Sequence, residues 1–209
     1  MEMTYDIDVL IESIAERVKE TSKTSFEDLV NYKCALKREI FIGGIDDGTG
    51  TMVDTLIRNW NDEDEKNNIP VEEREPIKLF IDSVGGSLTD AFTVCDSIMM
   101  SKTPVWGICT GIAYSAGFLI LISCHKRFGY PLSSYLFHEG QTKSGGTASQ
   151  FENYTAFYKK QLNQLKGIVV KRTNISEDEY ETIKKDDVWY DANEALEKNI
   201  IDEISKELI

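Results

Sequence analysis

Two histidines limit where this chain can carry out acid–base chemistry with imidazole, because it contains only His125 and His138. His125 lies directly before two basic residues, whose charge disfavours a protonated imidazole, and we assign it to a loop. His138 follows the apolar residues 135–137 and begins a glycine-bearing segment, a place where a rigid scaffold presents reactive side chains. His138 is therefore the candidate base, and a strand-end histidine bonded only to backbone is the alternative.

A serine that could act with this base lies in the small-residue sequence Gly111-Ile-Ala-Tyr-Ser-Ala-Gly117. We expect a turn here, between a strand and an apolar helix, so that Ser115 stands at a helix N-terminus. The free backbone N–H groups at such an end can hold an oxyanion. The sequence is not the G-x-S-x-G elbow, because position 113 is Ala. A turn that only packs the helix on the sheet is the alternative.

A second glycine turn, Asp82-Ser-Val-Gly-Gly-Ser87, occupies the same position one strand–helix unit earlier. Two adjacent glycines after a buried strand leave a backbone N–H free to point into a site. One donor from this turn and one from the residue after Ser115 would make a two-donor oxyanion hole. The alternative is a glycine turn followed by a helix cap, since Ser87 and Asp90 have capping-box spacing.

The elements that position these residues follow from hydrophobic periodicity. Strands alternate with helices from residue 77 onward, which predicts an α/β architecture with largely parallel strands. Charge density predicts an exposed loop at 61–76. Expected helices are 1–25, 26–37, 52–60, a segment starting at 88, the apolar segment 118–123, 149–172 and two short ones capped by Ser176 and Asp191; expected strands are 39–42, 77–81, 105–109, 135–137 and 200–204.

Composition excludes several classes of function. The formal net charge of −13 argues against binding to nucleic acid or anionic membranes, because both are polyanions. The start lacks a signal-peptide pattern and the longest apolar run, 116–122, is too short to span a bilayer, so a cytoplasmic protein is expected. The four cysteines form no C-x-x-C pair, so neither a disulfide framework nor a zinc site is expected.

Taken together, these motifs resemble the Clp protease proteolytic subunit over about residues 26–205. The Gly85-Gly86 turn matches that family's oxyanion loop, 111–117 its serine motif, and Leu136-Phe-His-Glu139 its histidine motif. The segment 186–195, followed by 200–204, matches its acid-bearing region. The resemblance implies a crotonase/Clp-protease-like spiral of ββα units with a protruding strand-helix handle. Since the resemblance begins near residue 26, we expect a Clp-protease-like peptidase domain at 26–209, preceded by an N-terminal acidic helical extension at 1–25 that hydrophobic periodicity predicts.

The resemblance also implies roles for individual residues. Ser115 would be the nucleophile, His138 the base and Asp187 the acid that orients it. Asp187 is identified by counting back from Ala192-Asn-Glu-Ala195, and Asp186 and Asp191 are its neighbouring carboxylates. The N–H groups of Gly85 and Ala116 would form the oxyanion hole.

The implied function is a serine endopeptidase that cleaves unfolded proteins or short peptides inside an oligomeric chamber, without a metal or organic cofactor. The resemblance implies heptameric rings stacked in pairs as a tetradecamer, with an AAA+ unfoldase as partner. The first alternative is a non-catalytic or weakly active structural subunit of a mixed ring. The others are an acyl-CoA enzyme of the crotonase fold and a Ser-Lys signal-peptide peptidase relative.

The chain departs from the family pattern near the expected site. Val84 stands where the family has proline, and Glu139-Gly140 stands where it commonly has Gln-Pro. Lys185-Asp186 reverses the family's acid–arginine order, and a charged segment replaces its apolar start.

Overall fold

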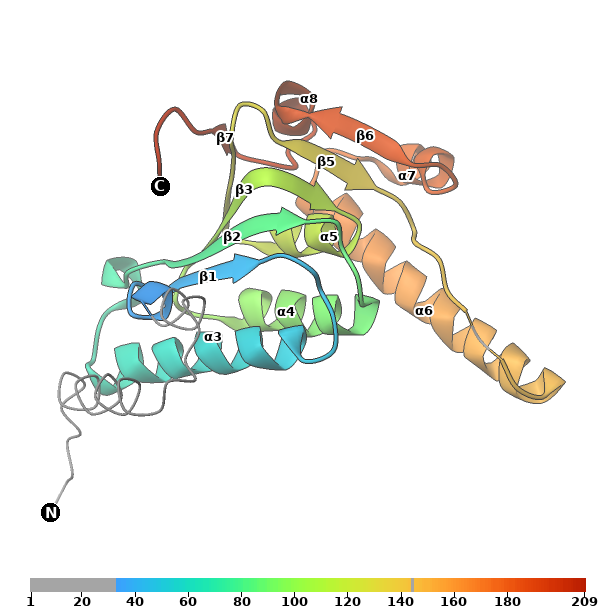
Figure 1. Ribbon diagram of the computed structural model, residues 1–209, viewed down its shortest axis with the longest axis horizontal. Coiled ribbons are helices and arrows are strands. Elements are labelled where there is room, and N and C mark those ends of the chain that lie inside the picture. Colours follow the sequence, from blue (N-terminus) through green and yellow to red (C-terminus); the bar gives the residue numbers. More distant parts are fainter. Residues whose placement is uncertain (1–32, 144) are drawn as a thin grey trace, which may run out of the picture. The chain divides into compact units, whose positions relative to one another are not determined.

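A computed structural model of the protein describes residues 33–143 and 145–209 (Figure 1). Residues 38–209 form one compact unit, and residues 1–37 belong to a separate one. In the separate unit, residues 33–35 are helical. The helix predicted over 1–25 and most of the helix predicted over 26–37 lie outside the described residues. The domain boundary after residue 25 therefore stays a prediction.

The compact unit is built on a seven-stranded sheet that divides at its longest strand, β3. Its strands are β1 (Glu39–Ile42), β2 (Ile77–Ser83), β3 (Val105–Tyr114), β4 (Lys126–Gly129), β5 (Ser134–Phe137), β6 (Val188–Asp191) and β7 (Glu203–Ile204). The order β1-β2-β3-β4-β7 is parallel throughout. The first part of β3 pairs with β4, and its last residues pair with β5. Strand β6 then adds to β5 in the antiparallel direction.

Helices follow the strands and pack on the sheet. They are α3 (Thr49–Lys66), α4 (Leu88–Met100), α5 (Ala116–Ser123), α6 (Ala148–Arg172), α7 (Glu177–Ile183) and α8 (Ala192–Glu197), with a 3₁₀ turn at Val71–Glu73. Helices α3 and α4 lie together below β1 to β3, and α5 lies between α4 and α6 (Figure 1). The predicted α/β class with a largely parallel sheet is confirmed.

Helix α5 forms the centre of the core. All eight of its residues are buried. A helix that is apolar on every side is stable only inside a protein, because no face of it favours water. Its N-terminus is therefore fixed on all sides, which gives a rigid position to the residue that precedes it.

Three local predictions were wrong. Residues 61–66, predicted as part of an exposed loop, continue helix α3, because Asp64 is fully buried and bonded to Arg38 and Thr103. Residues 111–114, predicted as a turn, complete strand β3. The strand predicted at 200–204 is reduced to β7, since Ile200 and Ile201 are core residues that pair with no strand.

Helix α6 corresponds to the helical part of the predicted handle. Only Leu165 and Val169 of its 25 residues are buried, and the rest of it extends away from the sheet (Figure 1). The described residues of 139–147 form no strand, so the strand of the predicted handle is absent from this part of the chain. Large apolar side chains stay exposed on this helix at Phe151 and Phe157.

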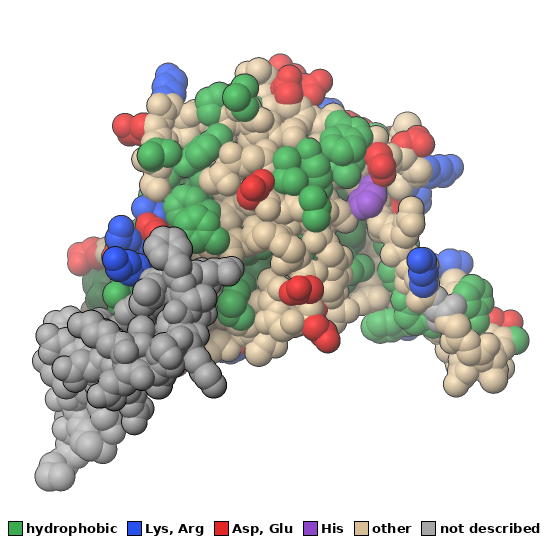
Figure 2. All heavy atoms as spheres, in the orientation of Figure 1, with side chains coloured by type: hydrophobic (Ala, Val, Ile, Leu, Met, Phe, Trp, Pro, Cys, Tyr) green, Lys and Arg blue, Asp and Glu red, His purple; other side chains and the backbone are tan. Residues whose placement is uncertain are grey.

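The molecular surface mixes charge with apolar area. On the face in Figure 2, acidic and basic side chains are spread singly and apolar side chains gather between them. Exposed aromatic rings include Phe41 and Trp189. Among the described residues, no helix combines the length and apolar character that crossing a membrane requires.

Candidate active site

Ser115 connects the last residue of β3 to the first residue of α5 in an uncommon backbone conformation. Its φ of 54° and ψ of −115° lie in a region that costs free energy for a residue with a Cβ. Two hydrogen bonds hold the turn: the Ser115 N–H donates to the Leu136 carbonyl at 2.9 Å, and the Leu119 N–H donates to the Ser115 carbonyl at 3.2 Å. Strand β5 and helix α5 thus hold the serine in this strained turn.

His138 reaches the serine because β3 and β5 run side by side. Tyr114 pairs with Leu136, so the residues that follow both strands emerge at the same edge of the sheet. The His138 Nε2 atom lies 2.7 Å from Ser115 Oγ. The imidazole is 27% exposed, so it faces both the serine and solvent.

Asp187 meets the opposite side of the same imidazole. It directly precedes Val188 of β6, which pairs with Phe137 of β5. His138 directly follows Phe137, so both residues lie just beyond the same end of this antiparallel strand pair. The His138 Nδ1 atom lies 3.2 Å from Asp187 Oδ1. An ionised carboxylate can only accept, so these distances fit a tautomer in which Nδ1–H donates to Asp187 and Nε2 accepts from the serine hydroxyl.

The structure also separates Asp187 from its two neighbouring carboxylates. Asp191 accepts hydrogen bonds from the N–H groups of Asn193 and Glu194 and caps helix α8. Asp186 lies in the turn after α7, where its own N–H donates to the Ile183 carbonyl. Among the described carboxylates, the one bonded to His138 is therefore that of Asp187, which is 61% exposed.

The glycine turn presents a different donor from the one predicted. The Gly85 N–H donates to Ser83 Oγ at 3.0 Å and is buried, so it is not free to bind an oxyanion. The next residue, Gly86, lines the cavity beside Ser115, and no acceptor for its N–H lies among the described residues. Gly86 has φ 150°, and a Cβ on it would lie 1.9 Å from the Ile45 carbonyl oxygen. The available donor is thus Gly86 rather than Gly85.

Sequence reasoning missed this shift, although a signal was present. Ser83 stands two residues before Gly85, and a serine hydroxyl commonly accepts from the backbone N–H two residues on. The other predicted donor, Ala116, is the first residue of α5 and lines the same cavity. Its N–H belongs to the first turn of the helix, where no intrahelical acceptor exists.

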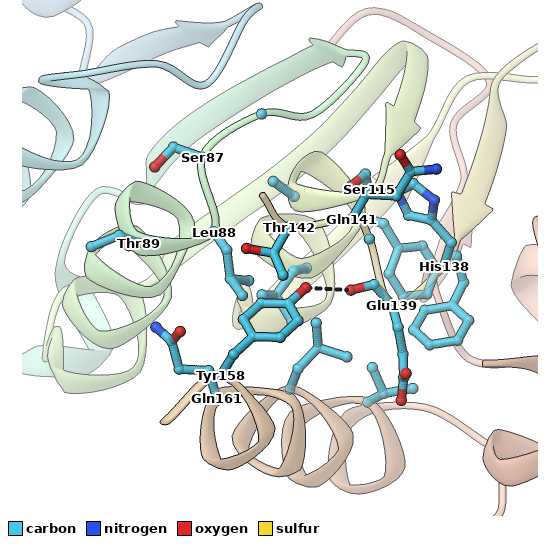
Figure 3. Close-up of a pocket in the computed structure, with 18 of the residues that line it drawn as sticks. Ser87, Leu88, Thr89, Ser115, His138, Glu139, Gln141, Thr142, Tyr158 and Gln161 are labelled. Atoms are coloured by element: carbon cyan, nitrogen blue, oxygen red, sulfur yellow. Dashed lines mark hydrogen bonds between the residues drawn. The ribbon is translucent and has the colours of Figure 1, made fainter. Parts of the chain in front are cut away.

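A cavity of about 510 Å³ opens beside Ser115 (Figure 3). Helices α4, α5 and α6 and the segment after His138 line it. Its apolar lining residues include Leu88, Phe118, Leu119, Leu165 and Val169. Figure 3 shows Thr142, Tyr158 and Gln161 around the same space. A cavity that combines apolar and polar side chains next to a nucleophile is suited to part of a peptide substrate.

His125 lies away from this site. Its Nδ1 accepts from the Val105 N–H at 3.0 Å, and burial together with the nearby Arg172 lowers its pKa. Its predicted place in a loop is confirmed, because it lies between α5 and β4. The part of the chain that the structure describes holds no group of three or more His, Cys, Asp or Glu side chains arranged for a metal ion.

Comparison with known proteins identifies relatives over most of the compact unit. The model of the family described as Clp protease matches residues 69–207, which is more than half of the chain. The chain is 33% identical over 129 residues to the "ATP-dependent Clp protease proteolytic subunit 2" of Treponema pallidum (strain Nichols). It is 28% identical over 193 residues to the protein of the same name from Tropheryma whipplei (strain Twist).

These matches differ in extent. The Treponema pallidum match covers 61% of this chain and 65% of that relative, so the aligned part spans less than two thirds of its length. The Tropheryma whipplei match covers 91% of this chain and 100% of that relative. A 27% match to an "ATP-dependent Clp protease proteolytic subunit 1" from Shouchella clausii (strain KSM-K16) covers 64% of this chain and 70% of that relative.

Proposed function

This chain belongs to the Clp protease family, and we propose that it is a serine endopeptidase that cleaves unfolded polypeptides through Ser115, His138 and Asp187. The observation that carries the proposal is the continuous set of contacts from Ser115 Oγ to His138 Nε2 at 2.7 Å and from His138 Nδ1 to Asp187 Oδ1 at 3.2 Å. This is the geometry that activates a serine hydroxyl as a nucleophile.

In the proposed reaction, Asp187 accepts the Nδ1 proton of His138 in a hydrogen bond and keeps Nε2 unprotonated. His138 takes the hydroxyl proton as Ser115 Oγ attacks the carbonyl carbon of the peptide bond. His138 then gives this proton to the leaving amine as the C–N bond breaks. Water, deprotonated by the same imidazole, attacks the acyl ester and releases the serine.

The tetrahedral intermediate carries its negative charge on the former carbonyl oxygen. We assign its two donors to the backbone N–H groups of Gly86 and Ala116, both of which line the cavity. The second donor also lies at the N-terminus of α5, whose dipole favours negative charge. Two N–H donors stabilise the intermediate most when their positions are fixed before the reaction. The buried helix α5 supplies that rigidity.

Membership of the Clp protease family also suggests how the chain assembles. We propose heptameric rings stacked in pairs, which would enclose the site and admit only unfolded or short peptides, and an AAA+ unfoldase as partner in the cytoplasm. Helix α6 supports ring stacking, because it extends from the sheet with Phe151 and Phe157 exposed. Exposed large apolar side chains of this kind are common at protein–protein interfaces.

The test is hydrolysis of a fluorescently labelled, permanently unfolded protein by the purified chain, alone and mixed with candidate ring partners. Wild type should release fluorescent peptides, and Ser115→Ala should abolish the release. Thr51→Ala is the control for loss of a hydroxyl, because Thr51 is exposed on α3, away from the cavity and from α6, and should leave the rate unchanged. Hydrolysis that persists in the Ser115 variant would refute the proposal. A wild-type chain that stays inactive in every mixture would instead favour a non-catalytic structural subunit.

A further inference from the structure

Glu139, the residue directly after His138, is held by tyrosines from two different helices. The Tyr180 hydroxyl of α7 donates to Glu139 Oε1 at 3.2 Å. The Tyr158 hydroxyl of α6 donates to the Glu139 backbone carbonyl at 3.5 Å, the contact drawn as a dashed line in Figure 3. The side chain and the backbone of one residue are thus tied to separate elements.

The tyrosine that binds the carboxylate is fixed in the core. Tyr180 is 1% exposed, and its ring packs against Phe137 with centroids 5.4 Å apart. Most buried hydroxyls have a hydrogen-bond partner, and for Tyr180 that partner is Glu139. Burial and the charge of Glu139 raise the pKa of Tyr180, so its hydroxyl stays a donor. Loss of the carboxylate would leave this hydroxyl without its acceptor.

The same helix leads into the acid. Helix α7 ends at Ile183, and the Asp186 N–H donates to the Ile183 carbonyl in the turn that follows. Asp187 comes next. The hydrogen bond between Tyr180 and Glu139 therefore joins the segment that carries the base to the helix that leads to the acid.

The contact between base and acid needs such a support. His138 and Asp187 each lie one residue beyond the last paired residues of β5 and β6, so no ladder hydrogen bond fixes them. Their own contact is 3.2 Å long, and Asp187 is 61% exposed, so water competes for both partners. An exposed contact of this length does not hold two chain segments in place by itself.

We propose that Glu139 is a positioning residue, which through its hydrogen bond with Tyr180 sets the placement of His138 against Asp187. The inference rests on the proposed peptidase function and adds to it a residue outside the catalytic set. Position 139 requires a hydrogen-bond acceptor for the Tyr180 hydroxyl. Glutamine at this position should therefore preserve the placement of His138, and alanine should not.

The experiment compares Glu139→Ala, Glu139→Gln and Tyr180→Phe in peptide hydrolysis. We expect Glu139→Ala and Tyr180→Phe each to lower kcat at least about tenfold. In Tyr180→Phe, KM should stay within about twofold, because Tyr180 does not line the cavity and misplacement of His138 affects the reaction rather than binding. Glu139→Gln should restore kcat to within about twofold of wild type. The double variant should be no slower than Glu139→Ala, since both changes remove the same bond.

Tyr190→Phe is the matched control for loss of a tyrosine hydroxyl. Tyr190 is also buried, on β6, and its hydroxyl has no hydrogen-bond partner among the described residues. It should keep the wild-type kcat. Melting temperatures close to that of wild type in all variants would exclude unfolding as the cause of a lower rate.

A second readout does not depend on catalysis. With only two histidines in the chain, the Cε1–H signal of His138 can be assigned by NMR from a histidine-labelled His125→Gln protein. It should shift in Glu139→Ala and Tyr180→Phe and keep its wild-type position in Glu139→Gln and Tyr190→Phe. This pattern in a chain that hydrolyses nothing would refute the peptidase proposal and leave the positioning role supported.

Three results would overturn the positioning role. The first is wild-type kcat in Glu139→Ala or Tyr180→Phe. The second is a Glu139→Gln variant as slow as Glu139→Ala, which would make charge rather than hydrogen bonding the cause. The third is a His138 signal that is unchanged in both disruptive variants.

Discussion

Replacing Asp187 by Asn tests the weakest contact of the proposed catalytic set. The amide keeps the size of the carboxylate and removes its charge. During the reaction His138 becomes an imidazolium, and the charge of Asp187 would stabilise it. The Nδ1–Oδ1 distance of 3.2 Å and the 61% exposure of Asp187 together set how large this stabilisation is.

Two unit charges about 4 Å apart attract by about 1 kcal/mol in bulk water and by about 4 kcal/mol at the effective dielectric constant near a protein surface. Asp187 is more than half exposed, so the pair lies between these limits. Since about 1.4 kcal/mol changes a rate tenfold, Asp187→Asn should lower kcat by about fivefold to about a thousandfold. This is less than the loss of about 10⁴-fold known for the buried aspartate of serine proteases.

The assay is steady-state hydrolysis of a fluorogenic peptide, with Asp186→Asn as the matched control. Asp186 is the adjacent carboxylate, and Asp186→Asn changes the net charge by the same amount as Asp187→Asn. The side chain of Asp186 makes no hydrogen bond to His138. It should keep the wild-type kcat. A loss below about twofold in Asp187→Asn, or an equal loss in both variants, would refute the assignment of the acid.

Other variants and reagents test the packing that supports the site. Tyr190→Phe should raise the free energy of unfolding by about 1 kcal/mol in urea titration, because it removes a buried hydroxyl without a partner among the described residues; a destabilised variant would contradict this. Asp64→Ala should lower that free energy by about 3 kcal/mol, since it removes the fully buried partner of the largely buried Arg38 and leaves only the longer 3.5 Å contact with the more exposed Glu63; a loss below about 1 kcal/mol would show that the pair is dispensable. In thiol alkylation at pH 8 followed by mass measurement, only half-buried Cys34 should react quickly. Burial shields the other three cysteines and raises their thiol pKa, to about 12 for Cys109, so rapid labelling of a second thiol in folded protein would contradict the described core.

The sequence predicted the elements whose signals are local. Helix α6 was expected at 149–172 and runs over Ala148–Arg172, because its apolar residues recur at helical spacing and a threonine caps its start. Ser115 was expected in a turn at a helix N-terminus and His138 at a strand end, and the structure brings Ser115 Oγ and His138 Nε2 to 2.7 Å. Apolar strands and small-residue motifs carry this information without reference to the rest of the chain.

The sequence did not predict features that depend on distant partners. Strand β4 was missed because Lys126 and Arg127 look like loop residues; Arg127 is 6% exposed only because Asp202 and distant carbonyl groups bind its guanidinium. The continuation of α3 through the charged residues 61–66 depends in the same way on Arg38 reaching Asp64. A charged residue that is buried by pairing has the same sequence signal as one in solvent.

In the site, the wrong oxyanion donor has a local cause. Counting along a motif gives the position of a glycine turn but not the direction of each N–H group. Whether Gly85 or Gly86 presents a free donor is decided by the hydroxyl of Ser83, which accepts from Gly85. The support of His138 through Glu139 and Tyr180 joins residues 41 positions apart, a distance at which one sequence holds no pairing signal.

The central claim is that Ser115 is a nucleophile activated by His138. The most direct measurement is mass spectrometric mapping of the residue that a fluorophosphonate modifies in the intact protein. We predict one phosphonylated residue, Ser115, with labelling lost in Ser115→Ala and greatly slowed in His138→Gln. Modification at another serine, or equal labelling of Ser115 with and without the imidazole, would contradict it.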